Sequence, residues 1–254
     1  MLNYIKAELW KVSRRRSFWG LTEILAALAF LFFLLCAMSE ATLAELAGDL
    51  PAFQFVGMLL APLLVQTVDS HCTTGTLKNE LSFGLSRHLV YLGKLWAILV
   101  AGVGLAISLM GGALGFGWLF LAHGTGDSLW TNGMILLFTI LAALPLWCGA
   151  AGFCHMAAML IPNAGAWVTG YYLLFFFGQP MLVVIASLLF RGNMSAWPME
   201  IIQIILMPYT LLMAEYLSGS LTLEYQLWCW GVGMLWLWGS TAAGIALFSR
   251  RDVQ

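Results

Sequence analysis

Residues 94–122 read KLWAILVAGVGLAISLMGGALGFGWLFLA, an apolar run whose one charged residue, Lys94, stands at its start. A helix needs about 20 consecutive apolar residues to cross the hydrocarbon core of a bilayer. The run is apolar on all sides, whereas the strands of a membrane barrel alternate with a period of two. It therefore predicts a membrane-spanning helix, and the rest of the chain repeats the pattern.

Five more segments of the same kind are separated by short polar stretches. The composition agrees, because 61% of the 254 residues are hydrophobic and only 9% are charged, against about 25% charged in soluble domains. The first run, Phe18 to Met38, exceeds the roughly 7–15 residues of a signal-peptide core, so we interpret it as a retained span. We expect an all-α integral membrane protein, a single domain over 1–254. Its six predicted spans are 18–38, 52–68, 94–122, 132–160, 164–190 and 227–248.

The basic residues predict how these spans are oriented. If both termini are cytoplasmic, every Lys and Arg except Arg191 falls on the inner side, which is the positive-inside pattern. The inner residues are Lys6, Lys11, Arg14, Arg15, Arg16, Lys78, Arg87, Lys94, Arg250 and Arg251.

The region 191–226 contains one shorter apolar run that needs a separate interpretation. Residues Ile201 to Met213 include Pro208, and a run of about 13 residues more often re-enters or lies at the interface than spans. If it spanned, Arg250 and Arg251 would move outside. We therefore expect an outer re-entrant or interfacial element between spans five and six.

The first 17 residues are predicted to form an amphipathic interfacial helix. Ile5, Leu9 and Val12 recur at helical spacing, with charged residues between them and a basic cluster after them. The helix either contacts anionic lipid headgroups or anchors the topology of span one, and the two roles are compatible. The residues expected to contact lipid are Lys6, Lys11, Arg14, Arg15 and Arg16.

No stretch of the chain suggests a catalytic or metal site. HExxH and the Walker A glycine loop are absent from the sequence, and the four histidines are dispersed without carboxylates at ligand spacing. The one carboxylate well inside an apolar run is Glu23, which can pair with the Arg14–Arg16 cluster or reach the inner surface. Because proton and ion carriers usually keep ionisable residues at membrane depth, this scarcity favours an external energy source.

The inner loop 69–90 is the most informative stretch. Leu77, Leu81 and Leu85 recur every four residues, Gly84 can end a helix, and Ser86 can cap the next one. The pattern predicts a short amphipathic helix at the inner face. Its leucine stripe either docks on a partner or packs on its own protein, and the pattern fits both equally.

At this loop the chain resembles a known family. The run GTLKNELSFGLSRHLVYLGKL, Gly75 to Leu95, is similar to the corresponding segment of ABC type-2 exporter permeases, including those of lantibiotic-immunity and bacitracin-resistance systems. The opening MLNYIKAELWKVSRRRSFW, the length and the six-span layout are also similar to theirs. One departure is the pair Thr73-Thr74 before Gly75, where many members carry a carboxylate.

The resemblance implies a function. It implies a permease subunit of an ATP-driven exporter in a bacterial cytoplasmic membrane, paired with a second copy or a sister permease and with a cytoplasmic ATPase dimer. ATP and Mg would be bound by that ATPase, and this chain would need no cofactor. The cargo would be an amphipathic peptide antibiotic or a lipid-like compound. The ATPase-coupling residues would be Thr76, Leu77, Lys78, Glu80, Leu81, Leu85 and Arg87.

Several interpretations remain open beside this one. Gln66 and Gln179 are candidate polar points on a substrate path, or donors in interhelical hydrogen bonds. Gly104, Ser108 and Gly112 predict close helix packing on span three, either within the chain or across a dimer, as do Gly111 and Gly115. A non-transporting ABC-linked immunity or sensor protein, or a polytopic membrane enzyme, are the alternative functions. A net charge of −1 gives no indication of a nucleic-acid partner.

Overall fold

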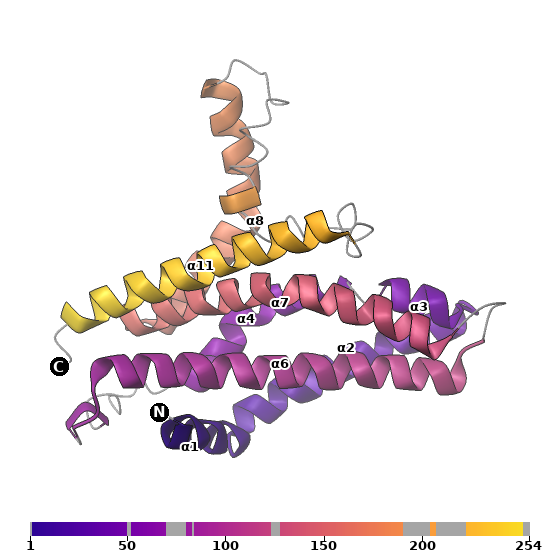
Figure 1. Cartoon of the computed structure of the whole chain (residues 1–254), viewed down its shortest axis with the longest axis horizontal. Helices are drawn as coiled ribbons and strands as arrows, with labels where there is room; N and C mark the ends of the chain where they lie inside the picture. Colours follow the sequence, from indigo (N-terminus) through magenta and orange to yellow (C-terminus); the bar gives the residue numbers. More distant parts are fainter. Residues whose placement is uncertain are drawn as a thin grey trace.

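The computed structural model describes residues 2–49, 52–69, 80–82, 84–122, 128–189, 204–206 and 222–250. Within these ranges the regular elements are all helices, and the only pairing of strand type is an isolated bridge between Thr42 and Ala122 (Figure 1). The predicted all-α class is thus confirmed. The helices are α1 (Leu2–Ser13), α2 (Arg16–Met38), α3 (Leu43–Asp49), α4 (Ala52–Asp69), α6 (Arg87–Phe120), α7 (Leu129–Leu160), α8 (Ala164–Leu189) and α11 (Leu223–Arg250).

Four of these helices are long and apolar enough to cross a membrane. They are α2, α6, α7 and α11, whose most apolar windows have mean hydropathies of 2.4, 2.2, 2.2 and 1.4. The other two predicted spans coincide with α4 and α8, which hold shorter apolar stretches, Val56–Val68 and Ala164–Gly178. The character of a helical membrane protein is therefore clear, while the count of six spans stays a prediction.

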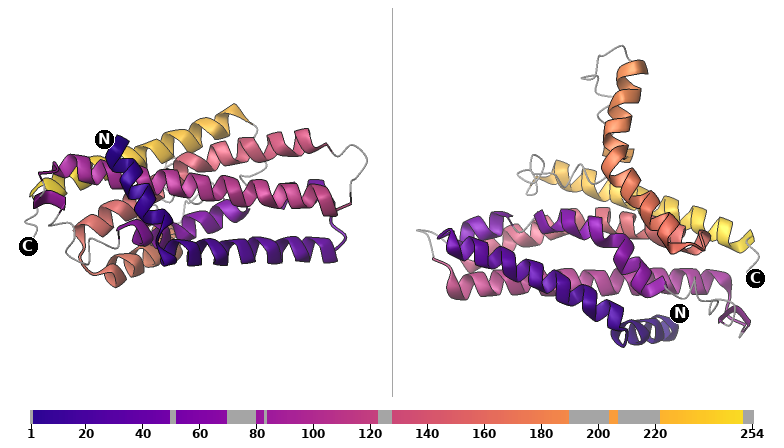
Figure 2. Two further views of the ribbon diagram at one scale, coloured as in Figure 1. Left: turned by 90° about the horizontal axis from the view of Figure 1, so that it is seen from below. Right: turned by 180° about the vertical axis from the view of Figure 1, so that it is seen from behind.

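Most of the long helices lie lengthwise in one bundle (Figures 1 and 2). α1 lies across α6 at one end, and α8 starts beside the bundle before turning away from it. Pro180 lies inside α8, where a proline removes one backbone hydrogen bond and bends a helix. α8 continues through Pro180. Pro162 lies two residues after Leu160, the last residue of α7.

The charged residues separate between the two ends of the bundle. α1, the start of α6 and the end of α11 lie together at one end (Figure 1), which we call the basic end. It carries Lys6, Lys11, Arg14, Arg15, Arg16, Arg87, Lys94 and Arg250. α3, with Glu45 and Asp49, lies at the opposite end. The predicted orientation would place the basic end in the cytoplasm.

Among the described glycines, those of α7 and α11 bring one helix backbone against another. A Cβ added at Gly233 would meet the backbone of Pro145 and Leu146, and one at Gly149 would lie 2.9 Å from the Gly233 carbonyl oxygen. Added Cβ atoms at the predicted glycines of α6, namely Gly104, Gly111, Gly112 and Gly115, meet nothing within 4 Å. The prediction of close packing within the chain is wrong for these four residues.

Candidate functional site

The junction between the inner loop and α6 is built as the sequence predicts. Gly84 adopts a left-handed φ of 84°, which glycine accepts without steric cost, and its N–H donates to the Leu81 carbonyl at 3.1 Å. The Ser86 hydroxyl then accepts from the Leu89 N–H at 3.3 Å and caps α6. The short turn holds the last described part of the loop, residues 80–82, against the first turns of α6.

At this junction four charged side chains form one network at the basic end. The Glu80 carboxylate accepts from the Tyr4 hydroxyl at 3.0 Å and from the Lys11 ammonium at 3.3 Å. The Glu8 carboxylate pairs with Lys11 at 2.6 Å and with Lys94 at 3.4 Å. Lys94 also lies 3.6 Å from Glu80. The network joins three parts of the chain: α1, the inner loop and α6.

The network has a buried centre, Glu8 and Lys94, and a partly exposed edge, Glu80 and Lys11, and its charges balance. Glu8 and Lys94 are both 0% exposed, and a buried charge without a partner is very costly. Two carboxylates facing two ammoniums offset part of that cost. Burial alone raises the pKa of Glu8, but Lys94 and Lys11 together lower it by more, so the pKa of this carboxyl lies below its ordinary value of 4.5.

The sequence positions these groups through helix periodicity and one glycine. Tyr4, Glu8 and Val12 are spaced by four residues, so they share the face of α1 that packs on the bundle. Gly93 makes room for this face, because an added Cβ would lie 2.6 Å from Cε1 of the Tyr4 ring. Lys94 follows directly and reaches Glu8.

Two arginines fasten helix ends beside the network. Arg15 donates to the carbonyls of Thr67 and Val68 at the end of α4. Arg87 donates to Phe248 at 3.0 Å and to Ser249 at 2.9 Å, at the end of α11. The last carbonyls of a helix have no partner within it, and a cation there is favourable. Both arginines therefore tie helices together at the basic end.

The predicted coupling residues differ in where the structure places them. Thr76, Leu77 and Lys78 lie outside the described residues. Leu81 and Leu85 are half-buried and pack against the main core, so in the described part the leucine stripe packs on its own protein. Glu80 and Arg87 are the members of the predicted set that the structure places in polar contacts.

The other predicted site residues are dispersed. Among the predicted lipid contacts, Lys11 and Arg15 bind protein groups, while Lys6, Arg14 and Arg16 are exposed; the Arg14 guanidinium also lies 5.6 Å from the centre of the Trp10 ring. Gln66 is exposed on α4, and Gln179 lies in α8 with its side chain outside the described set.

Glu23 also has a clear position. It is exposed on α2, and within the described ranges it forms no salt bridge with the Arg14–Arg16 cluster.

The pairing of Glu8 with Lys94 was missed by sequence reasoning. Glu8 stands between apolar residues of an amphipathic helix and Lys94 among the inner cations, which are positions that usually face solvent. One signal was present, because Glu8 shares its helix face with Tyr4 and Val12. That signal shows a shared face but not which segment covers it.

The fold and this network define a helical protein of membrane character whose basic end is fastened by buried polar contacts. Comparison with known proteins adds no family: no family model matches the chain, and no curated protein matches it.

Proposed function

We propose that the chain is the membrane-spanning permease subunit of an ATP-driven exporter, with six spans and both termini in the cytoplasm of a bacterium. The resemblance of Gly75 to Leu95 to ABC type-2 permeases supports the class. The observation that carries the proposal is the buried network, because it connects the end of the expected coupling loop to two other segments.

The network gives a route for mechanical coupling. An ATPase that displaces the inner loop pulls on Glu80, which holds Tyr4 and Lys11 of α1 and lies beside Lys94 of α6. Since buried ion pairs are costly to separate, α1 and the inner part of α6 follow the loop as one body. Arg87 passes the displacement on to the end of α11.

The remaining parts of the assembly follow from the resemblance. ATP and Mg are bound by the partner ATPase dimer, and a second copy or a sister permease completes the membrane unit. The cargo is an amphipathic peptide antibiotic or a lipid-like compound, moved outward.

A contact near the outer region supports the re-entrant interpretation of 191–226. The Trp236 indole N–H donates to the Ile205 carbonyl at 2.5 Å. Trp236 is 13 residues after Leu223, where α11 begins, or about 20 Å along the helix. Ile205 therefore lies well below the outer end of α11, as expected if the segment re-enters the membrane.

The test is purification of the tagged chain from its native cells in mild detergent, followed by ATP hydrolysis measurements on the purified material. We expect an ATPase to co-purify and to be lost with Leu81→Asp, because a carboxylate at this half-buried position separates the loop from the core on which it packs. His88→Asp adds the same charge at an exposed neighbouring position and should keep the ATPase bound. Size-exclusion profiles show whether the Leu81 variant is still folded.

A second variant tests the route itself. Glu80→Gln is expected to keep the ATPase bound but to lower the rate of ATP-driven efflux from vesicles at least tenfold. The reason is that the inner loop then contributes no carboxylate to pair with Lys11 and Lys94. If no ATPase accompanies the native chain in several detergents, the permease proposal fails.

A further inference from the structure

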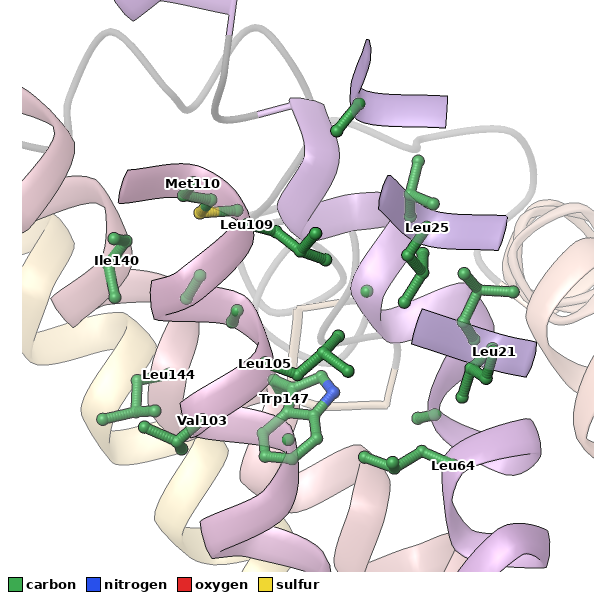
Figure 3. A pocket seen from close by; sticks show the side chains of 18 of the residues that line it. Leu21, Leu25, Leu64, Val103, Leu105, Leu109, Met110, Ile140, Leu144 and Trp147 are labelled. Carbon is green, nitrogen blue, oxygen red and sulfur yellow. The ribbon is translucent and has the colours of Figure 1, made fainter. Parts of the chain in front are cut away.

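A cavity of about 130 Å³ lies between α2, α4, α6 and α7, and it is partly open to the surroundings. Leu21 and Leu25 of α2 face Leu105 and Leu109 of α6 across it, and the Trp147 ring forms part of its wall (Figure 3). All residues that line it are apolar or aromatic. It shares no residue with the ion-pair network.

The cavity lies at the depth of the hydrocarbon core. Along α2 it extends from Leu21 to Phe32, which are 5 and 16 residues beyond Arg16, the first residue of α2. At about 1.5 Å per residue these positions lie roughly 8 and 24 Å from the basic end. A bilayer core is about 30 Å thick, so the cavity falls within it.

We propose that this cavity holds an acyl chain of an anionic phospholipid. A dry cavity of about 150 Å³ lined by aliphatic and aromatic side chains binds benzene, so the size and the lining suit a few carbons of an alkyl chain. Leu28 on α2 and Ile107 on α6, next to lining residues, are 45% and 56% exposed. The opening is therefore bordered by apolar surface, and lipid chains are the apolar material that a bilayer brings to it.

The charge at the start of α2 selects the headgroup. Arg14 and Arg16 are exposed there, and within the described part of the chain no carboxylate pairs with them. Arg16 lies about 8 Å along the α2 axis from the nearest lining residue, Leu21, and Arg14 lies in the turn just before α2. This is the level a phosphate occupies when its chain enters the cavity. Basic residues at the membrane surface attract anionic lipid.

This inference does not rest on the proposed export function. The lipid is a resident ligand of the helix bundle, bound whether or not an ATPase joins the chain. The outcome of the lipid experiment is thus separate from the outcome of the ATPase purification.

The test uses phosphatidylglycerol carrying a photoreactive diazirine in the middle of one acyl chain, in phosphatidylcholine vesicles that hold the full chain. We expect labelling to concentrate on peptides containing Leu105, Leu109 and Trp147. Ala29→Phe fills the cavity from α2 and is expected to reduce this labelling at least fivefold. Ala27→Phe, its matched control, adds the same ring at an exposed position of α2 outside the lining and is expected to change it less than twofold.

Two results would overturn the proposal. Labelling spread evenly over outward residues such as Leu119 and Phe120, and equal in both variants, would show only the surrounding lipid. Displacement by unlabelled phosphatidylcholine as readily as by phosphatidylglycerol would overturn the anionic headgroup. Ala106→Phe fills the cavity from α6 and replaces Ala29→Phe if that variant does not fold.

Discussion

The basic end of the bundle and its middle are held together by different physics. At the basic end Glu8, Lys94 and Glu80 make directional contacts from three segments. In the middle the helices α2, α4, α6 and α7 meet through apolar side chains around a cavity. Directional ion pairs transmit displacement and tolerate little change, whereas an apolar cavity adapts to what fills it. The two regions thus suit a mechanical joint and a binding space, respectively.

Removal of the Lys94 ammonium from the basic end should cause the largest loss of stability. Lys94→Met leaves the buried Glu8 and the partly exposed Glu80 facing Lys11 alone, and loss of one partner of a buried pair costs roughly 3–5 kcal/mol. We expect that loss in the free energy of unfolding, measured by denaturant titration in detergent micelles. Lys6→Met, an exposed cation on α1, should change it by less than about 0.5 kcal/mol.

A double substitution sharpens this first prediction. Glu8→Gln combined with Lys94→Met leaves one carboxylate and one ammonium, so most of the lost stability should return. If the two losses simply add, Glu8 and Lys94 do not act as a pair, and the network is wrongly assigned.

The apolar helix contacts of the bundle, including the contact between α7 and α11, should be destabilised by added side-chain volume rather than by a change of charge. Gly233→Leu places a side chain against the backbone of Pro145 and Leu146, and overpacking costs about 1–3 kcal/mol or more. Gly231→Leu is the matched control on α11, since a Cβ there meets nothing within 4 Å. The same unfolding titration should show a lower free energy of unfolding for Gly233→Leu but not for Gly231→Leu. Equal losses at both positions would instead indicate a general effect of leucine on α11.

The contrast between the two regions also explains what the sequence could predict. Apolar runs define the helices well: α4 and α8 begin at the predicted residues, and α7 ends where expected. α6 begins at Arg87 instead of 94, because the charged Lys94 separates the short apolar stretch 89–93 from the long apolar run that follows it. Ser86 and Gly84 were identified because caps and turns depend on neighbouring residues.

Contacts between segments distant in the chain could not be predicted from the sequence pattern. Glu8 and Lys94 are 86 residues apart, and a charged residue looks the same in a sequence whether it is solvated or paired. Small residues at helical spacing are equally ambiguous: Gly104 and Gly111 repeat on α6 without a neighbour, while Gly149 and Gly233 pack tightly. The helices were therefore predictable, and the network that links them was not.

Acid should weaken the basic end before it affects the middle. The pKa of Glu8 is lower in the folded chain than its ordinary value of 4.5, so its contribution to stability is complete above about pH 4.5 and is lost as the pH falls through the lowered pKa. Unfolding titrations between pH 6 and 3 should show a smaller decline for Glu8→Gln than for the native chain. Parallel declines would mean that Glu8 is not stabilised as a carboxylate.

The smallest expected effect comes from the serine that precedes a helix, compared between α6 at the basic end and α7 at the opposite end. Ser86→Ala removes the hydroxyl that accepts from the Leu89 N–H, and losing such a cap costs about 1 kcal/mol. Ser128 precedes α7 in the equivalent position, but its side chain makes no capping hydrogen bond, so Ser128→Ala should be nearly neutral. Hydrogen exchange of the first turns of α6 and α7 measures both. Faster exchange confined to α6 in the Ser86 variant would show that the cap holds the loop at the network, whereas unchanged exchange would show that the ion pairs alone hold it there.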